Sequence, residues 1–265
     1  MTFWRRKNIH DTDEVDNSRI IGADTPFAVK EAYRTLYTNI LYLPIDNGCK
    51  KIAISSSFSG EGKTCTSVNL AYTIAINAPE SKVLLIDSDM RNPRVTRIMN
   101  INTPKLHGLS EYLAGIDDEP NFVSTEYDNF FVLSSGAMSA NTLGLLSSAR
   151  MKALMEMCSE KFDYIVFDTT PINIVSDALL LEEHIDGYVI VTRADISDVN
   201  SVNQAVEAIN RVDGTVLGIV LTDLNVKKNG RYGKYGKYGK YGKYGRYGKY
   251  GKYDKYAGYD NIINS

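Results

Sequence analysis

The chain has 265 residues, of which 30 are Lys or Arg and 32 are Asp or Glu, and 43% are hydrophobic. That length suits one large α/β domain with a tail, and no apolar run approaches the roughly 18 residues that a membrane-spanning helix needs. The near-neutral total hides an asymmetry. Eleven basic and two acidic residues give the segment from Val226 onward a formal charge of +9, while the rest of the chain carries −11.

The beginning of the chain is polar and aperiodic, so we expect a mobile arm over residues 1–24 and no secretory signal, which would need an apolar core. Three cysteines without C-x-x-C spacing suit a reducing cytosol. Neither the cysteines nor the three histidines have the spacing of a metal site.

Apolar periodicity predicts alternating helices and strands along the rest of the chain. The helices are expected at Pro26–Leu43, Lys63–Ile76, Leu143–Lys161, Ser176–His184 and Ser197–Val212. The strands are expected at Lys51–Ser56, Val83–Asp87, Phe130–Ser135, Tyr164–Asp168, Gly187–Thr192 and Val216–Thr222. The strand sequences lack polar alternation, which favours a mainly parallel, doubly wound sheet buried on both faces. We expect this α/β domain to span residues 25–225, followed by a tail over 226–265.

The first of three informative strand ends is the stretch SSSFSGEGKT, residues 55–64, which lies between a predicted strand and a predicted helix. Glycines let backbone N–H groups face phosphate oxygens, and the helix N-terminus adds partial positive charge. The pattern predicts a phosphate-binding loop, with Lys63 on the phosphates and Thr64 on Mg²⁺, although serine stands at 57 where the usual spacing has glycine. The alternative is a glycine-rich loop that binds nothing. The expected ATP-binding residues are Ser57, Phe58, Ser59, Gly60, Glu61, Gly62, Lys63, Thr64 and Cys65.

The other two strand ends carry carboxylates. VLLIDSDMR ends in Asp87 and Asp89, and YIVFDTTP ends in Asp168. Carboxylates beside a bound triphosphate can hold Mg²⁺ or accept a proton from a nucleophile. The alternatives are helix capping for the first pair and turn initiation for Asp168. Because the carboxyl ends of parallel strands meet at one edge, the three signals together predict a nucleotide site.

These three segments resemble the Walker A, Walker A′ and Walker B sequences of bacterial tyrosine kinases, which control capsule and exopolysaccharide synthesis. That family's P-loop fold is related to the MinD and ParA ATPases. The resemblance implies transfer of the γ-phosphoryl of ATP to tyrosine with Mg²⁺ as cofactor. It implies Asp87 as the base and Lys63 as the group that stabilises the transferred charge. Catalytic residues would be Lys63, Asp87 and Asp89, and metal-binding residues Thr64, Asp87, Asp89 and Asp168.

The tail repeats Gly-Lys-Tyr, and we expect it to be disordered because it has too few apolar groups to offset ordering entropy. A tyrosine-rich C-terminus is typical of the same kinases, so the resemblance implies that the tail is the substrate. Phosphorylation adds about −1.5 to −2 per site, so five or six phosphates would cancel the tail's charge. The expected phosphoacceptors are Tyr232, Tyr235, Tyr238, Tyr241, Tyr244, Tyr247, Tyr250, Tyr253, Tyr256 and Tyr259.

The resemblance also implies partners. A kinase of this family without a membrane span works as a cytoplasmic protein recruited to the membrane by a separate activator of the polysaccharide chain-length determinant type. The phosphorylation made by such kinases is reversed by a tyrosine phosphatase. The kinases self-associate, in some cases into rings, through a helix that carries E-x-x-R-x-x-R. Here Glu31 and Arg34 match, but Tyr37 replaces the second arginine, which weakens the expected interface.

Two other functions remain open from the sequence. A MinD/ParA-like ATPase with a basic anion-binding tail would share the fold, although Ser57 replaces that group's signature lysine. Interleaved lysine and tyrosine would also suit an unspecific single-stranded nucleic-acid or polysaccharide binder. We expect no specific nucleic-acid partner. Related ATPases often place an adenine-contacting asparagine where this chain has Thr222, and Asn225 lies close by but is not aligned, so the adenine contact stays open. Arg91 is either a phosphate contact or an ion-pair partner of a nearby acid.

Overall fold

The computed structural model of the chain describes residues 20–22, 24–45, 48–101, 107–194 and 196–224. They form a seven-stranded sheet in the order β3-β4-β2-β5-β1-β6-β7. Only the pair β3–β4 is antiparallel, which confirms the mainly parallel sheet. The strands are β1 (Lys50–Ser56), β2 (Val83–Asp87), β3 (Val123–Ser124), β4 (Phe130–Leu133), β5 (Tyr164–Asp168), β6 (Gly187–Arg193) and β7 (Val216–Thr222).

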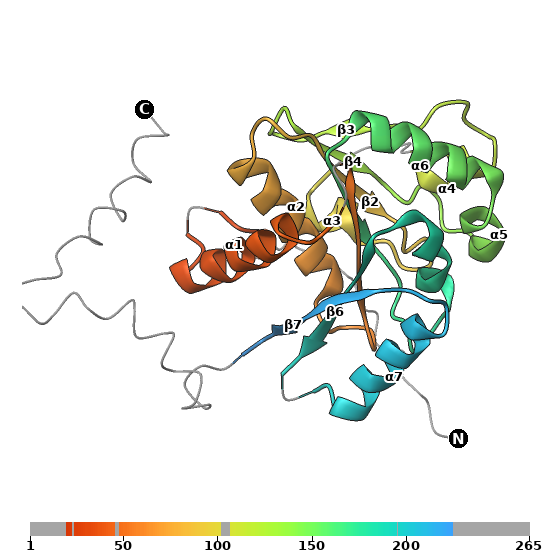
Figure 1. Cartoon of the computed structure of the whole chain (residues 1–265). Coiled ribbons are helices and arrows are strands. Elements are labelled where there is room, and N and C mark those ends of the chain that lie inside the picture. The colour runs from red at the N-terminus through yellow and green to blue at the C-terminus, as the bar shows by residue number, and fades with distance from the viewer. Residues whose placement is uncertain (1–19, 23, 46–47, 102–106, 195, 225–265) are drawn as a thin grey trace, which may run out of the picture. The chain divides into compact units, whose positions relative to one another are not determined.

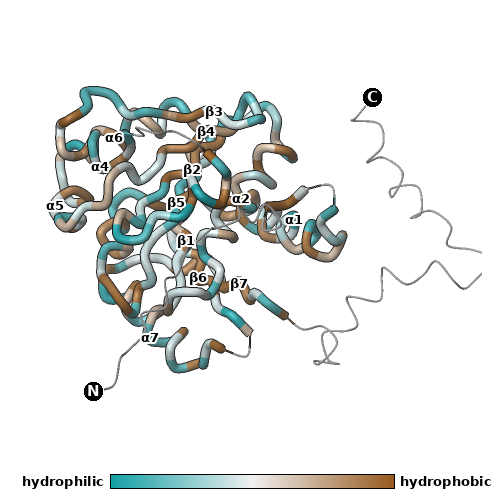
Figure 2. The backbone as a smooth tube through the Cα atoms, turned by 180° about the vertical axis from the view of Figure 1, so that it is seen from behind, coloured by the Kyte–Doolittle hydropathy of each residue, from teal (hydrophilic) through white to brown (hydrophobic). Residues whose placement is uncertain are grey.

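Helices cover both faces of the sheet (Figure 1). One face holds α1 (Phe27–Leu41), α2 (Lys63–Asn77) and α3 (Val95–Ile98). The other holds α4 (Leu109–Leu113), α5 (Thr142–Leu146), α6 (Ala149–Lys161), the 3₁₀ helix η2 (Asp177–His184) and α7 (Val199–Asn210). Seen from behind, the central strands lie between these two sets of helices (Figure 2). No helix among the described residues is long and apolar enough to cross a bilayer.

Each central strand feeds two hydrophobic cores because successive side chains point to opposite faces. In β2, Leu84 and Ile86 belong to the core under α4–α7, whereas Val83 and Leu85 belong to the core under α1–α3. All four side chains are fully buried. This two-sided burial explains why the sequence of β2 is a continuous apolar run. The strand pairs with β5 in the interior of the sheet.

Three predicted elements differ from the structure. The helix predicted from 143 to 161 is two helices, because Ser148 caps α6 by accepting a hydrogen bond from the Met151 N–H at 3.2 Å. The segment 177–184 is a 3₁₀ helix and not an α-helix. The last strand was expected to be buried on both faces, but β7 is an edge strand on which Ile219 and Leu221 are exposed.

Candidate active site

The phosphate-binding loop connects β1 to α2, as the spacing predicted. Gly60 and Gly62 have φ of 86° and 100°, in the left-handed region that only glycine enters without strain. A Cβ on Gly62 would lie 3.4 Å from the Thr222 side chain, an ordinary van der Waals contact, so the positive φ rather than lack of space favours glycine there. Gly62 ends the loop and Lys63 begins the helix, which directs the first N–H groups of α2 toward the loop.

Two residues of the loop, Glu61 and Ser57, are tied to β7, to α7 and to the segment that precedes α7. The buried Glu61 carboxylate accepts hydrogen bonds from the Phe58 N–H at 2.7 Å and from the Ser197 hydroxyl. The Thr222 hydroxyl donates to the Glu61 carbonyl at 2.8 Å. Ser57, at the position where glycine was expected, is buried and its hydroxyl donates to the Ser201 carbonyl at 3.1 Å. The serine therefore has a structural hydrogen bond of its own, and its φ is not positive, so this position does not require glycine.

Lys63 points into a group of buried carboxylates at the ends of β2 and β5. Its Nζ lies 2.9 Å from Asp89 Oδ2 and 3.8 Å from Asp168 Oδ1. Burial by itself lowers the pKa of Lys63, but the charges of Asp168 and Asp89 outweigh it, so the net direction is upward and the amine stays protonated. One ammonium faces three carboxylates (Asp87, Asp89 and Asp168), which we call the carboxylate cluster.

Asp87 is the most perturbed member of the carboxylate cluster. It is fully buried and stands directly opposite Asp168 in the β2–β5 register. Burial, followed by the charge of Asp168, raises its pKa to about 8. Its oxygens accept backbone hydrogen bonds from Asp89 at 3.2 Å, Arg94 at 3.2 Å and Val95 at 3.1 Å. The same carboxylate that could accept a proton therefore also holds the start of α3.

Asp168 provides the strongest sign that a cation belongs in the site. It is fully buried, its Oδ1 accepts from the Ser67 hydroxyl at 3.1 Å, and its Oδ2 has no hydrogen-bond partner among the described residues. Burial raises the pKa of Asp168, while Lys63 and the Thr64 hydroxyl oppose that rise. An unpartnered buried carboxylate oxygen in a cluster with a formal charge of −2 fits Mg²⁺, which prefers oxygen ligands and keeps its waters.

Arg91 does not contact the phosphate-binding loop. Its Nε and one terminal nitrogen donate to the two Asp177 oxygens at 2.6 and 3.1 Å, and the same terminal nitrogen donates to the Thr142 hydroxyl at 2.8 Å. Thr142 in turn donates to Asp177 at 2.8 Å. Of the two alternatives for Arg91, the structure therefore shows the ion pair.

A cleft of about 850 Å³ opens over the loop. One wall is the loop itself with the start of α2, and Asp89 lies beside it. The opposite wall is formed by α3, by the segment that leads into α3, and by the turn after β5. The residues that line this wall are Asn92, Arg94, Arg97, Ile98, Thr170, Pro171, Ile174 and Val175. The cleft thus extends from the phosphate-binding loop toward β2, on the side away from β6 and β7.

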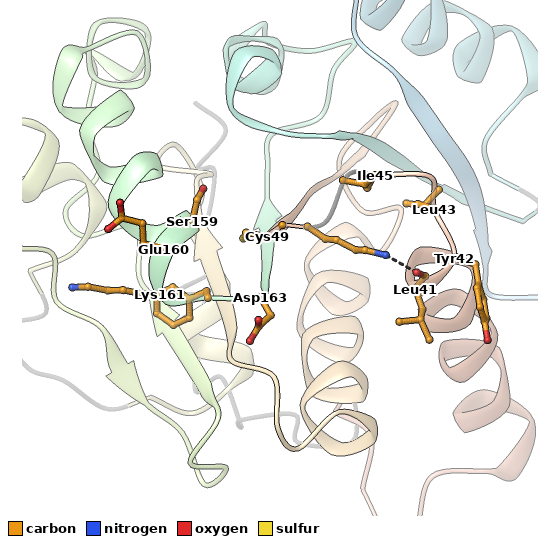
Figure 3. A pocket seen from close by; sticks show the side chains of 12 residues that line it. Leu41, Tyr42, Leu43, Ile45, Cys49, Ser159, Glu160, Lys161 and Asp163 are labelled. Atoms are coloured by element: carbon orange, nitrogen blue, oxygen red, sulfur yellow. Dashed lines mark hydrogen bonds between the residues drawn. The ribbon is translucent and has the colours of Figure 1, made fainter.

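A second cavity, of about 740 Å³, lies where β1 and β5 begin (Figure 3). Lys50 is one of its lining residues, and its Nζ donates to the Leu41 carbonyl at 2.5 Å, which satisfies the end of α1. Ligands in open α/β sheets bind at the opposite, carboxyl ends of the strands. This cavity carries none of the predicted site residues.

Comparison with known proteins supplies the family. A family model described as "AAA domain" matches residues 49–219. Tyrosine-protein kinase CpsD of Streptococcus pneumoniae serotype 4 is 37% identical over 201 residues, which cover 76% of this chain and 86% of that protein. The chain belongs to the bacterial tyrosine kinase family.

The solved structures agree with this kinase assignment. The kinase domain of Escherichia coli tyrosine kinase ETK is 29% identical, with a TM-score of 0.67 over 72% of this chain and 74% of that domain. The septum site-determining protein MinD from Pyrococcus horikoshii, complexed with Mg-ADP, is 20% identical with a TM-score of 0.53 over 65% of this chain and 70% of that one. The latter likeness shows a shared P-loop fold alone.

The kinase fold brings together the predicted Lys63, Thr64, Asp87, Asp89 and Asp168, while the roles of these residues stay predictions. On α1, Arg34 and Glu31 pair with each other at 2.8 Å, and Tyr37 packs edge-on against Tyr164 with ring centroids 6.3 Å apart. The ten tail tyrosines lie outside the described residues.

Two contributors to the kinase site, Arg94 and Asp177, were not singled out from the sequence. Glu61 was singled out as an ATP contact, but no motif pointed to its anchoring role. Arg94 lines the cleft, and Asp177 restrains Arg91. Arg94 gave no signal because it lies at the start of a helix too short to show a pattern of charges. Asp177 gave none because it is 86 residues away from its partner Arg91.

Proposed function

We propose that this kinase uses ATP and Mg²⁺ to phosphorylate the tyrosines of the tail, residues 226–265, of a second copy of the chain. The observation that carries the proposal is the buried cluster of Lys63 with three carboxylates under a phosphate-binding loop. Its formal charge of −2 matches one divalent cation. Family membership supplies the reaction, and the ten regularly spaced tyrosines supply the acceptors.

Thr64, Asp89 and Asp168 are the residues that would hold the metal. Asp168 offers an oxygen without a hydrogen-bond partner among the described residues, and Asp89 gives one oxygen to Lys63 and the other to the Asn92 N–H at 3.0 Å. A bound Mg²⁺ would supply positive charge to offset the negative charge that develops on the transferred phosphoryl group. Exchange of the Lys63–Asp89 contact for a Lys63–phosphate contact would release Asp89 toward the metal.

The remaining catalytic roles belong to the chain's own groups. The loop N–H groups and Lys63 would stabilise the charge on the transferred phosphoryl, which is usually the largest catalytic contribution. Asp87 would accept the proton of the tyrosine hydroxyl, whose ordinary pKa is near 10. Without a cation this carboxyl holds its proton at neutral pH, because its pKa is about 8. A cation held by its neighbours would favour the ionised form, and an ionised carboxylate with a raised pKa is a stronger base than an exposed one.

We also propose a regulatory setting for the reaction. The kinase would act in the cytoplasm, recruited to the inner face of the membrane by a separate activator of the polysaccharide chain-length determinant type, and control capsule or exopolysaccharide synthesis. A tyrosine phosphatase would reverse the modification. Self-association, up to a ring, would bring one copy's tail to the next copy's site, with Glu31 and Arg34 of α1 at the contact. The exposure of that pair leaves it accessible for such a contact.

The proposal is tested by incubating the full chain with Mg²⁺ and ATP and reading phosphates by intact mass. Wild type and Lys82→Met, an exposed-lysine control, should both show a ladder of phosphates, and Lys63→Met should show none. Mixing ¹⁵N-labelled Lys63→Met with unlabelled wild type distinguishes transfer within one chain from transfer between two copies. Phosphate on the labelled chain would prove transfer between copies. If no ladder forms, the activator's cytoplasmic peptide is added. ATP hydrolysis without phosphotyrosine, even then, would favour the ATPase alternative and refute the proposal.

A further inference from the structure

The wall of the cleft formed by α3 and the turn after β5 is the candidate acceptor side of the site. Phosphoryl transfer proceeds in line, so the attacking hydroxyl approaches from the side opposite to the leaving group. Lys63 and Asp89 mark the phosphate end, and the cleft continues past them to the wall formed by α3 and the turn after β5. That wall combines apolar side chains with arginine: Ile98, Pro171, Ile174 and Val175 with Arg94 and Arg97.

Two of the arginines that line the cleft differ in how they are held. The Arg91 guanidinium is committed to Asp177 and Thr142. The Arg94 backbone is fixed, because its N–H donates to Asp87, but its exposed guanidinium makes no hydrogen bond or ion pair with any residue that the structure describes. Arg94 is therefore a positive charge anchored through its main chain to the proposed base and available to a ligand in the cleft.

The tail offers that charge only two carboxylates. Nearly every tyrosine from 232 to 259 has lysine or arginine before it and glycine after it, a pattern that an arginine on the acceptor wall disfavours. The two exceptions with an acid immediately after the tyrosine are Tyr253, followed by Asp254, and Tyr259, followed by Asp260. Both lie at the far end of the tail.

We infer that Arg94 is a specificity-determining residue of the acceptor site, which selects tyrosines with an anionic neighbour, so that tail phosphorylation begins at Tyr253 and Tyr259. The inference rests on the proposed kinase reaction. The tyrosine ring would lie against the apolar part of the wall while the neighbouring carboxylate pairs with the Arg94 guanidinium. Arginine suits this purpose because its planar fork matches carboxylate and phosphate.

The three-residue repeat then lets the modification spread. Each new phosphotyrosine carries about −1.5 to −2 and stands three residues, roughly 10 Å in an extended chain, from the next tyrosine. It becomes the anionic neighbour that the lysine-flanked tyrosines lack. Phosphorylation should therefore advance from the distal end toward Tyr232, which is modified last.

The order of phosphorylation tests this inference in the full-length, dephosphorylated chain. Trypsin would release the same Tyr-Gly-Lys peptide from several repeats, so the sites must be read by electron-transfer fragmentation of the intact tail. At an average of one phosphate per chain, Tyr253 and Tyr259 should be occupied about two- to five-fold above the mean of the other eight, the range that one exposed ion pair supplies. Arg94→Ala and the Asp254→Asn/Asp260→Asn chain should both flatten this preference, whereas Arg211→Ala, an exposed arginine at the end of α7, should keep it.

A binding measurement separates this inference from the kinase reaction itself. A synthetic peptide of residues 248–265 is titrated into the full chain without nucleotide, beside the same peptide with both aspartates changed to asparagine. Wild type should bind the acidic peptide about two- to five-fold more tightly, and Arg94→Ala should bind both alike. If wild type prefers the acidic peptide but no phosphotyrosine ever forms, the proposed function alone is overturned. Phosphorylation with no distal preference, or a preference that Arg94→Ala leaves intact, would overturn the inference alone.

Discussion

Replacing Asp87 by asparagine should stabilise the nucleotide-free protein while removing its proposed base. The reason is the crowding of charge in the carboxylate cluster. Asp87 and Asp168 are fully buried, Asp89 is nearly so, and Lys63 is the one ammonium within reach among the described residues. Active sites commonly hold such strain at the expense of stability.

The size of the effect follows from the pKa of Asp87. In the folded chain this carboxyl keeps its proton up to about pH 8, whereas the unfolded value is 3.8. Between these pH values the unfolded state binds fewer protons, so stability is greatest below the unfolded pKa and falls as pH rises toward 8. Four pH units at about 1.4 kcal/mol each set an upper bound of about 6 kcal/mol, and relaxation and sharing with Asp168 reduce the expected effect to about 2–4 kcal/mol.

Asparagine removes this pH-dependent penalty at a small cost. Its amide oxygen can still accept from the Arg94 and Val95 N–H groups, but its NH₂ group then faces the Asp89 N–H, which costs about 1 kcal/mol. Asp87→Asn should therefore match wild type within about 1 kcal/mol near pH 5 and exceed it by about 2–3 kcal/mol near pH 8.

The assay is urea unfolding of the full chain at several pH values between 5 and 8.5, in EDTA and without nucleotide. Asp198→Asn is the matched control, because Asp198 caps α7 by accepting from Ser201, and that backbone hydrogen bond lowers its pKa. Its removal should lower stability at neutral pH, the opposite direction. If Asp87→Asn is destabilised equally at every pH, Asp87 is ionised in the folded protein and the reasoning is refuted.

Three further predictions concern the supports of the site. Glu61→Ala removes the acceptor of the Phe58 N–H and should weaken ATP binding about tenfold by calorimetry, with Glu61→Gln intermediate; unchanged affinity in both would contradict the anchoring role. Asp177→Ala leaves Arg91 without its bidentate partner and should lower the free energy of unfolding by about 2–3 kcal/mol in urea, a loss that Asp177→Asn should partly restore. Tyr188→Phe deletes the buried hydrogen bond to the Ala178 carbonyl and should cost about 1–2 kcal/mol, and no change would mean that the carbonyl finds another donor.

The placement of the catalytic groups was predictable because it follows from topology. Parallel strands end at one edge, so Lys63, Asp87 and Asp168 had to converge once β1, β2 and β5 were neighbours. Local signals were also sufficient for the turn at Gly62. At Ser148 a local capping signal was also present, but the prediction gave more weight to the apolar periodicity, which extends across Ser148 and is typical of one continuous helix.

What the sequence did not predict depends on long-range contacts. The choice between a phosphate and an acid as partner of Arg91 was decided by Asp177, which the fold brings in from beyond β5. The importance of Arg94 depends on which residues share its cleft, and no spacing rule encodes that. Likewise, β7 reads like a central strand, and only its position at the end of the strand order shows that one side is unpaired.

The two electrostatic effects on the tail oppose each other, and their difference in range decides the outcome. The body's formal −11 attracts the +9 tail over a distance set by the Debye length, about 8–10 Å near physiological salt. At contact, the Arg94 guanidinium instead repels the lysines that flank most tyrosines. Under the inference above, attraction would bring the whole tail close, while the cleft would first accept its two acidic positions. As phosphates accumulate, contact at the acceptor wall becomes favourable and the long-range attraction fades, with five or six phosphates cancelling the tail's charge. Such a kinase would modify its tail readily once begun and then release it, so raising the salt concentration should slow the first phosphorylation more than the later ones.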